Sequence, residues 1–305
     1  MAKASWLWPL LYHLCRLLLA FVYLASGALK ALDPQGFAVE VARYGLLQGT
    51  ASTSFAYVLI PLELVVGAAL LVDYRGFLGM SSAVCLMIMF IGAVGFAIAT
   101  DQPLEGCGCF GRSVQRTPAQ TLMEDFGFLA AGLIGLFAGR RRVVATAPRS
   151  PRRWKAATVV SVLLSSSAFV AASLHLPIDN IATALRPGVT WKELGVTLPD
   201  VPLSSGTHLV AVMSMTDQTS AEALPTLNAL AASGISVVGL YDDGEEAYNQ
   251  FFWNLGPAFR LHYVAPSDLK QLYRSRPRFF ALKEGAVVAT WTGRLDASEV
   301  RASMK

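Results

Sequence analysis

The chain has 305 residues, of which 54% are hydrophobic and only 15% are charged. A soluble protein normally carries about a quarter charged residues, so this composition predicts a membrane protein. The net charge of +4 indicates no nucleic-acid partner, because the basic residues gather in one short block, and four cysteines are too few for a disulfide-rich scaffold.

Five apolar runs are each long enough to cross the hydrocarbon core of a bilayer, which takes about 20 residues. They cover residues 7–29, 55–72, 77–99, 121–138 and 156–174. The first run is too long for the apolar part of a signal peptide, and Lys3 is the only basic residue before it, so we predict an uncleaved span. Cys15 and Cys85 lie inside the first and third runs, where a lone cysteine usually behaves as a small apolar residue.

The orientation of these spans is predicted from the loop at residues 140–155, which is rich in arginine and contains no acidic residue. The positive-inside rule assigns such a loop to the cytoplasm. Counting spans in both directions then predicts a protein of the bacterial inner membrane with a cytoplasmic N-terminus. The loop between spans three and four and the region after span five are both predicted to be periplasmic.

The loop between spans three and four contains the stretch Gly106-Cys107-Gly108-Cys109-Phe110-Gly111. Two thiols one residue apart can form a disulfide in a short, strained loop, and strained or exposed disulfides are the labile and oxidising ones. A reversible dithiol/disulfide and a static disulfide that closes the loop are both compatible with this pattern. A zinc site is less favoured, because two thiolates leave two ligands missing and no histidine lies near in sequence. Cys107 and Cys109 are therefore the candidate catalytic residues, and no metal site is predicted.

Several ionisable residues lie within or at the edge of the spans, where charged groups are costly and are expected to pair inside the bundle. We expect Lys30, Glu63 and Glu124 to form a polar cluster beneath the cysteine loop, with Asp125 and Arg16 as further charged residues. Such a cluster is typical either of a proton path or quinone-headgroup site that serves the thiols, or of a structural ion-pair network with snorkelling side chains. The structural interpretation is favoured for Arg16 and Lys30.

The chain becomes polar and contains prolines over residues 175–202, which predicts a linker with little regular structure. Residues 203–305 have the alternating pattern of a soluble domain with a mixed sheet covered by helices. Strands are predicted at residues 208–213, 235–241, 259–264, 279–283 and 286–292, and helices at residues 221–233, 244–255, 267–274 and 296–304.

This order of elements, with Pro277 just before the last hairpin, resembles the thioredoxin-like fold of membrane-tethered thiol–disulfide proteins. In that family a Cys-x-x-Cys opens the first helix, which also carries a proline. The resemblance implies that Asp217 and Ser220 stand at the two cysteine positions, and that Pro277 is the cis-proline that shapes a substrate groove. The domain is then expected to dock a partner at these three residues without redox chemistry of its own. Met213 and Met215 would be soft metal ligands only with further ligands that the sequence does not offer.

The membrane half also resembles a family, the DoxX/MauE group of four-helix membrane proteins. The resemblance covers roughly residues 10–138 and rests on Arg16, Ala25-Ser26-Gly27, Lys30, Asp33-Pro34, Phe37, Pro61-x-Glu63-x-x-x-Gly67 and Cys107-Gly108-Cys109-Phe110-Gly111. MauE-like members are implicated in redox maturation of periplasmic enzymes alongside a thioredoxin-like partner, and DoxX-like members in quinone-coupled sulfur oxidation. The fused arrangement resembles bacterial DoxX-like proteins with a cysteine-less thioredoxin-like tail.

The predicted fold class is a polytopic α-helical membrane bundle followed by a soluble α/β thioredoxin-like domain. Residues 1–139 form the four-helix DoxX/MauE-like part, the span at 156–174 is a fifth, tethering helix, and the thioredoxin-like domain at 203–305 is periplasmic.

Two functional hypotheses follow from this architecture, and both imply contact with the lipid bilayer and with a periplasmic or membrane protein partner. In the first, Cys107 and Cys109 act as a membrane thiol–disulfide oxidoreductase that uses a quinone as cofactor. Arg112 and Arg116 either lower the pKa of a thiol in this protein or are ordinary loop arginines. In the second, the protein is a non-enzymatic scaffold or assembly subunit, in which the Cys107–Cys109 bond is structural and the tail is a docking module.

Overall fold

The computed structural model describes residues 6–102, 117–141, 152–173, 176, 178–198 and 201–304. The chain divides into two compact units, Met1–Leu176 and Pro177–Lys305, which we call the membrane domain and the C-terminal domain. Each is described by itself.

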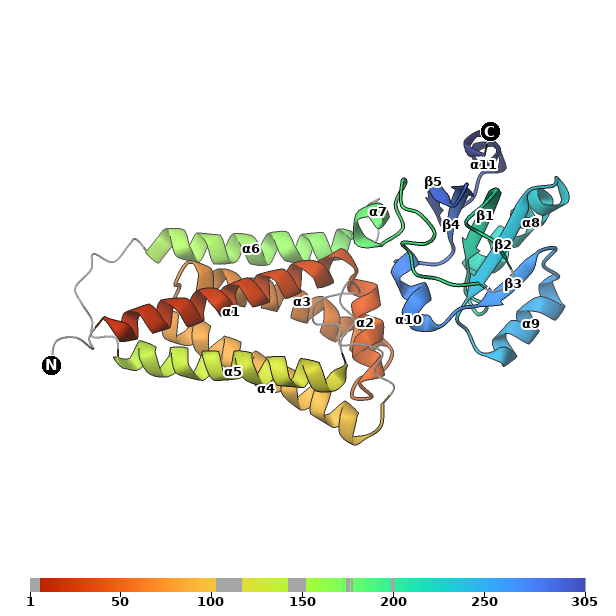
Figure 1. The fold of residues 1–305 in the computed structure, drawn as a ribbon. Coiled ribbons are helices and arrows are strands. Elements are labelled where there is room, and N and C mark those ends of the chain that lie inside the picture. The colour runs from red at the N-terminus through yellow and green to blue at the C-terminus, as the bar shows by residue number, and fades with distance from the viewer. Residues whose placement is uncertain are drawn as a thin grey trace. The chain divides into compact units, whose positions relative to one another are not determined.

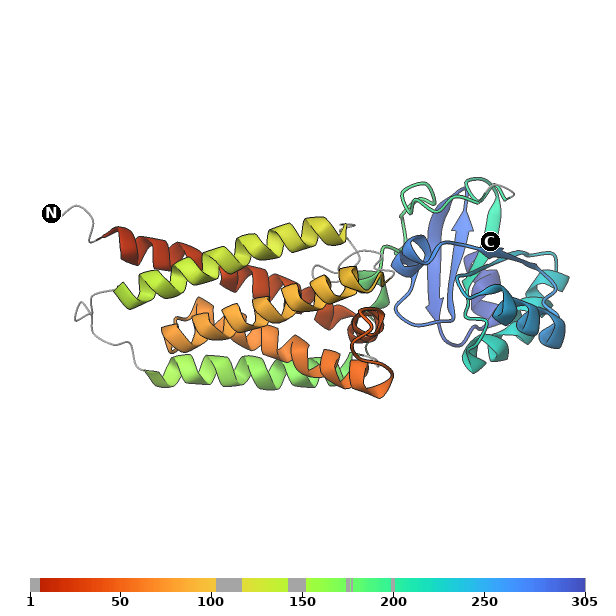
Figure 2. The ribbon, with the colours of Figure 1, turned by 90° about the horizontal axis from the view of Figure 1, so that it is seen from below.

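The membrane domain is helical. Its helices are α1 (Leu7–Leu32), α2 (Pro34–Arg43), α3 (Thr50–Leu71), α4 (Gly76–Ala99), α5 (Pro118–Arg141) and α6 (Arg152–Ala172). Five of these described helices, all except α2, are long and apolar enough to cross a membrane. Helix α1 packs against α3 and α5, α4 packs against α5, and α3 packs against α6 (Figures 1 and 2). The protein is therefore a membrane protein.

Helix α2 was not predicted, because its ten residues are too short and too polar to be recognised as a span. The Asp33 side chain caps its N-terminus by accepting a hydrogen bond from the backbone N–H of Gly36 at 3.0 Å, and Pro34 fits the first helical position. The helix lies across one end of the bundle (Figure 1). It buries Phe37 and Val41 against the long helices, so it closes that end of the bundle with apolar side chains.

Helices α1 and α3 approach each other closely because glycines face the contact. A Cβ atom added at Gly67 would lie 2.8 Å from Cγ of Leu24 and 3.0 Å from the backbone nitrogen of Leu24. A Cβ atom added at Gly27 would lie 2.9 Å from Cγ of Leu64. Small residues allow this kind of close packing between membrane helices. The contact sets the distance between α1 and the face of α3 that carries Glu63.

We expect Gly67→Leu to separate α1 from α3 and to destabilise the membrane domain by about 1–3 kcal/mol or more, because the new side chain overlaps the backbone of α1. Thermal unfolding in detergent measures the effect. Gly95→Leu on α4 is the matched control, since a Cβ atom there has no neighbour within 4 Å. Equal melting temperatures for the two variants would contradict this packing.

Arg16 on α1 has a structural role in the same helix pair. Its guanidinium Nη1 donates hydrogen bonds to the backbone oxygens of Leu70 and Leu71, at 3.0 Å for Leu71. The last carbonyl groups of a helix have no partner within the helix and carry partial negative charge. Arg16 therefore caps the C-terminal end of α3, in agreement with the structural interpretation of this residue.

The C-terminal domain has a five-stranded sheet with the order β3-β2-β1-β4-β5. The strands are β1 (Thr207–Val212), β2 (Ser236–Tyr241), β3 (Arg260–Tyr263), β4 (Arg278–Lys283) and β5 (Ala286–Thr292). The helices are α7 (Asp179–Ala182), α8 (Gln218–Ala232), α9 (Glu245–Leu255), α10 (Pro266–Leu269) and α11 (Ala297–Ser303). Strands β1, β2 and β3 are parallel, and the β4–β5 hairpin joins β1 in antiparallel pairing. This is the thioredoxin-like arrangement, so the predicted fold class is confirmed.

Alternating residues of the central strand β1 enter two apolar cores, one on each face of the sheet. Leu209 and Ala211 pack with α8, α9 and α11 on one face. Val210 and Val212 pack on the other face with residues between 185 and 203 and with residues of α10. The sheet is therefore buried on both faces.

The segment predicted as a linker, residues 175–202, has little regular structure but forms part of this second core. Leu185 and Leu194 are 0% and 2% exposed, Trp191 stacks on Phe280 with ring centroids 6.2 Å apart, and Thr190 forms a bridge to Ala286. The described part of the segment is thus a cover for one face of the sheet. The sequence did not indicate this burial, because a cover without helix or strand has no periodic apolar pattern.

The start of this segment is attached to the sheet by a buried arginine. Nη2 of Arg278 on β4 donates to Oδ1 of Asn180 at 2.7 Å, and Nη1 lies 3.2 Å from Oδ2 of Asp179. Burial lowers the pKa of the Arg278 guanidinium, while the Asp179 carboxylate acts in the opposite direction. The attachment joins α7 to β4 through an ion pair and a hydrogen bond.

Candidate functional site

A buried ion pair joins α1 and α3 near one end of the bundle. The Lys30 ammonium contacts the Glu63 carboxylate, and the two side chains are 2% and 0% exposed. The other carboxylate oxygen of Glu63, Oε2, accepts a hydrogen bond from the Ser26 hydroxyl at 3.2 Å. Charges inside a membrane protein are tolerated when they pair in this way. We call this end of the bundle the Lys30 end, and the opposite end, which holds the turn between α3 and α4, the Asp73 end.

Two aromatic rings surround the Lys30 ammonium. Its Nζ atom lies 4.9 Å from the ring centroid of Phe37 on α2 and 5.0 Å from that of Phe90 on α4. Cation–π contacts of this length stabilise a desolvated ammonium. Four helices, α1 to α4, therefore fix the position of one positive charge.

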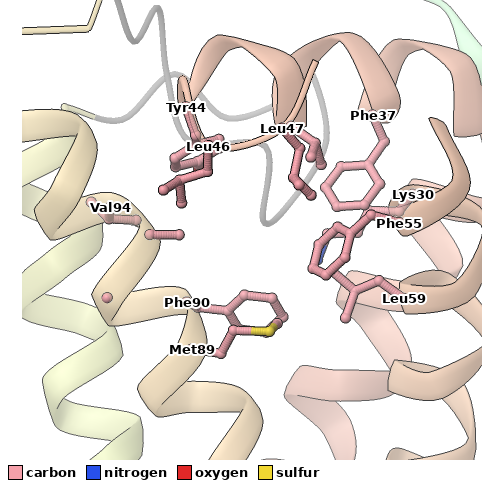
Figure 3. Close-up of a pocket in the computed structure, with 13 residues that line it drawn as sticks. Lys30, Phe37, Tyr44, Leu46, Leu47, Phe55, Leu59, Met89, Phe90 and Val94 are labelled. Atoms are coloured by element: carbon pink, nitrogen blue, oxygen red, sulfur yellow. The ribbon is translucent and has the colours of Figure 1, made fainter. Parts of the chain in front are cut away.

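A cavity of about 420 Å³ lies beside this charge at the Lys30 end. Phe37, Phe55 and Leu59 face Met89, Phe90 and Val94 of α4 across it, and Tyr44 and Leu46 border it (Figure 3). Its other lining residues are Lys30, Val41, Leu47, Gly92 and Ala93. The volume is within the range of about 300–1,000 Å³ that is usual for small-molecule sites. The site is an apolar, aromatic cavity with one cation in its wall.

The predicted catalytic residues Cys107 and Cys109 fall within residues 103–116, outside the described part of the chain, as do Arg112 and Arg116. The last described residue before this segment is Gln102, which follows the C-terminal end of α4. A Cβ atom added at Gly45 would lie 3.1 Å from the Gln102 side chain, so Gln102 lies beside the connection between α2 and α3. The neighbours of Gly45, Tyr44 and Leu46, line the cavity. Gln102, the last described residue before the segment with the cysteine pair, thus lies at the Lys30 end, next to residues that line the cavity.

Glu124, the third residue expected in the polar cluster, lies on α5 and is half-buried, and its neighbour Asp125 is 6% exposed. The structure brings Lys30 of α1 and Glu63 of α3 together in an ion pair. The place of Glu124 in the polar cluster stays a prediction. Sequence reasoning missed the aromatic part of the site, because Phe37 and Phe90 are separated by more than fifty positions and give no local signal.

The three residues predicted at the thioredoxin-like site lie near one another in the C-terminal domain. Asp217 caps α8 by accepting the N–H of Thr219 at 3.4 Å, and the fully buried Ser220 hydroxyl accepts a backbone N–H at 3.0 Å. Pro277 follows a cis peptide bond directly before β4. The Thr219 hydroxyl donates to the backbone oxygen of Arg276 at 3.4 Å, which links the two parts. Hydrogen bonds of Asp217, Thr219 and Ser220 thus stabilise the N-terminus of α8.

A charged network that the sequence analysis missed lies beside these residues. The Arg276 guanidinium pairs with Asp242 and lies 3.6 Å from Oδ2 of Asp243. The Tyr273 hydroxyl donates to Asp242 at 3.3 Å, and the backbone N–H of Met215 donates to Asp243 at 2.8 Å. A signal was present, since Asp242-Asp243 follows the end of β2, and polar residues at the carboxyl ends of parallel strands often meet in space.

Metal binding has little support in the described residues. Met213 and Met215 are 0% and 6% exposed and pack in the apolar core beneath α8. Among the residues that the structure describes, no group of three or more histidine, cysteine, aspartate or glutamate side chains is placed to hold a metal ion.

Together, these features define a polytopic membrane protein with an aromatic cavity in its bundle and a thioredoxin-like domain at its C-terminus. Residues 8–138 match the family model of methylamine utilisation protein MauE, so the membrane part is similar to that family. No curated protein matches the chain.

One matching solved structure is the bacterioferritin comigratory protein of Xanthomonas campestris, whose alkyl peroxide reduction activity is the subject of that work. It is 17% identical to this chain, and the match covers 41% of this chain and 89% of that one with a TM-score of 0.27. The thioredoxin-like fold is assigned here from the strand order and pairing of the sheet itself.

Proposed function

We propose that the protein is a membrane thiol–disulfide redox protein that exchanges disulfides with a periplasmic protein through Cys107 and Cys109 and is coupled to a quinone in the cavity. In the exchange, a substrate dithiol becomes a disulfide while the Cys107–Cys109 disulfide becomes a dithiol, so two electrons and two protons move to the pair. A quinone bound in the cavity would take up two electrons and two protons from that dithiol and restore the disulfide. Each half-reaction is balanced, and both can run in reverse.

The observation that carries this proposal is the aromatic cavity at the Lys30 end. Its apolar walls suit a flat, lipid-soluble ring, and aromatic side chains provide ring faces for stacking. Its volume of about 420 Å³ accommodates a headgroup of one or two fused rings. The residues present therefore fit a quinone.

The Lys30–Glu63 pair supplies the polar chemistry. An ammonium has three N–H donors, and the Glu63 contact leaves others to bind a carbonyl oxygen in the cavity. Glu63 and the rings of Phe37 and Phe90 keep the charge in place and exclude water around it. A fixed cation favours negative charge that develops on a bound oxygen atom.

The position of Gln102 supports coupling between the cavity and the thiols. Cys107 is five positions beyond Gln102 in the sequence, and five residues of extended chain span at most about 17 Å. Gln102 itself lies beside residues that border the cavity. The proposal therefore assigns both partners of the electron transfer to one end of the bundle.

In this proposal the C-terminal domain docks the partner protein on the periplasmic side. The sequence of this domain contains no cysteine, so thiol exchange falls to the membrane domain. The network of Arg276, Asp242 and Asp243 beside Pro277 adds charged groups at the site where thioredoxin-like domains hold a substrate. A docking role uses these groups without requiring a disulfide in the domain.

Filling the cavity tests the proposal. Gly92 lines the cavity and a Cβ atom added there has no neighbour within 4 Å, so Gly92→Trp places a ring in the cavity without a clash at Cβ. We expect this variant to bind a short-chain quinone at least about tenfold more weakly and to reduce it more slowly after reduction of the thiols, because the site is occupied. Anaerobic quinone absorbance and a binding titration in detergent give the two readouts.

Gly95→Trp on the same helix is the control, because Gly95 does not line the cavity and also has free space at Cβ. The control is expected to retain wild-type quinone binding. Unchanged quinone binding in Gly92→Trp, or equal losses in both variants, would exclude this cavity as the quinone site.

A further inference from the structure

A row of five aromatic rings lies on the C-terminal domain and plays no part in the proposed redox chemistry. The rings of Tyr241 and Tyr248 stack with centroids 5.1 Å apart, and the Tyr241 ring meets that of Tyr263, on the edge strand β3, edge-on at 5.8 Å. Along α9 the Tyr248 ring stacks on Phe252 at 5.8 Å, and Phe252 meets Trp253 edge-on at 5.4 Å. We call these residues the aromatic row: Tyr241, Tyr248, Phe252, Trp253 and Tyr263.

The two ends of the aromatic row are exposed to solvent. Trp253 is 79% exposed and Tyr263 is 59% exposed, and Leu255 at the end of α9 is 43% exposed. Phe251 of the same helix, by contrast, is buried in the core between α9 and the sheet. Helix α9 therefore has one apolar side in the core and a second, aromatic side on the surface. Large apolar side chains that gather on a surface in this way are typical of a binding site.

The charge around the aromatic row is negative. Residues 241–259 contain four acidic residues and no lysine, arginine or histidine. Two of the four are the aspartates that pair with Arg276. The other two, Glu245 and Glu246, lie exposed in the first turn of α9, and neither has an ion pair in the part of the chain that the structure describes. Two carboxylates can therefore pair with a cation from another molecule.

The Glu245 carboxylate lies close to the aromatic row. Glu245, Tyr248 and Phe252 are spaced by three and four positions along α9, which places them on one side of the helix. Burial raises the pKa of the Tyr241 hydroxyl, and Tyr248, Glu245 and Tyr263 raise it further. A carboxylate acts on a phenol in this way only at short range. A cation bound over the rings is thus within reach of a carboxylate.

This combination of ring faces and carboxylates is suited to the side chain of an arginine. A guanidinium stacks on an aromatic ring and donates paired hydrogen bonds to a carboxylate at the same time. Arg260 of β3 does not fill this role, because successive strand residues alternate and it lies on the other face of the sheet from Tyr263. The charges of Glu245 and Glu246 repel an anionic bilayer surface and attract a basic protein segment.

We propose that the aromatic row docks an arginine-rich segment of a partner protein. Guanidinium groups of the segment stack on the exposed rings of Trp253 and Tyr263, and the carboxylates of Glu245 and Glu246 pair with them. Apolar side chains of the segment contact Leu255. The inference uses neither the cysteine pair nor the quinone, so it and the redox proposal can fail separately.

Peptide binding to the full chain in a neutral detergent tests the proposal. The probe is a short fluorescent peptide in which arginine alternates with serine. Its controls replace each arginine with glutamate or with citrulline, which has the shape of arginine without the charge. We expect the arginine peptide to bind at least about tenfold more tightly than the citrulline peptide, because several cation–π and ion-pair contacts act together. Added salt should weaken the binding, since the carboxylates are exposed.

Trp253→Ala and the double variant Glu245→Gln/Glu246→Gln are each expected to weaken binding of the arginine peptide by about threefold or more. Trp253→Phe keeps a ring and should retain most of the binding. Ile181→Ala is the control for Trp253, since Ile181 on α7 is 74% exposed, and Glu222→Gln on α8 is the control for the exposed glutamates. Both controls are expected to bind like the wild type, and melting temperatures show that each variant is folded.

Equal binding of the arginine and citrulline peptides would overturn the proposal, as would equal losses in the variants and their controls. Light scattering of the purified protein tests a second copy of the chain as the occupant. Self-association that disappears in Trp253→Ala, without any peptide binding, would identify that copy as the occupant and would also overturn the proposal.

Discussion

Replacing Glu63 with leucine is expected to destabilise the membrane domain by about 3–5 kcal/mol, because the variant leaves the Lys30 ammonium buried without its carboxylate. The Lys30 side chain is only 2% exposed, so it reaches water only if the surrounding helices move. The free energy of unfolding in mixed micelles, measured by titration with SDS, gives the size of the effect. Quinone reduction is expected to fall with it, since Lys30 loses the group that fixes its position.

The double variant Lys30→Met/Glu63→Leu separates stability from function. Replacing both members of a buried ion pair by apolar residues of similar size is often neutral or stabilising, so we expect the double variant to recover most of the lost stability. Quinone reduction should stay low, because the cation in the cavity wall is gone. A double variant that reduces quinone at the wild-type rate would show that the pair is purely structural.

Cys107→Ser/Cys109→Ser is expected to abolish thiol–disulfide exchange, with a loss of rate on the order of a thousandfold or more, because the variant has no nucleophile at this site. Exchange is measured with a reduced test protein as substrate, and folding is followed by the melting temperature in detergent. Cys15→Ala/Cys85→Ala is the matched control, since it also removes two of the four cysteines. This control is expected to keep its activity.

The same variants distinguish the redox function from the alternative hypothesis of a non-enzymatic scaffold. If the Cys107–Cys109 bond only closes its loop, the double serine variant should lose stability or assembly with a partner, and the wild type should show no exchange. Loss of exchange with unchanged folding and assembly supports the redox function. Loss of assembly alone would contradict it.

The membrane helices, the inward-facing charges and the thioredoxin-like sheet could be predicted from the sequence, because each has a strong local pattern. Apolar runs of bilayer length predicted the membrane helices, because in lipid each helix must satisfy its own backbone hydrogen bonds. The cost of a charge in lipid also predicted that Lys30 and Glu63 would turn inward, which the ion pair shows. The alternating strands and helices after residue 203 predicted the thioredoxin-like sheet.

The cavity, the cover of the sheet and the Arg276 network are built from residues that are distant in sequence, and they could not be predicted from local patterns. The cavity at the Lys30 end depends on α2 and on Phe90 of α4, and neither is marked in the sequence as part of a site. Trp191 and Leu194 were assigned to a linker, since their burial comes from covering a sheet and not from a helical or strand period. The network around Arg276 joins residues more than thirty positions apart, and only the two aspartates at the end of β2 gave a sequence signal for it. Local patterns contain little information on contacts between distant residues.

The reduction potential of the Cys107–Cys109 pair tests the central claim most directly. It is measured in the purified protein on the Cys15→Ala/Cys85→Ala background, by trapping thiols after equilibration with a series of glutathione or dithiothreitol ratios. We predict a value between about −120 and −230 mV, the range of oxidising and exchanging dithiol pairs. A value well below about −300 mV would identify a structural disulfide and contradict the proposed function.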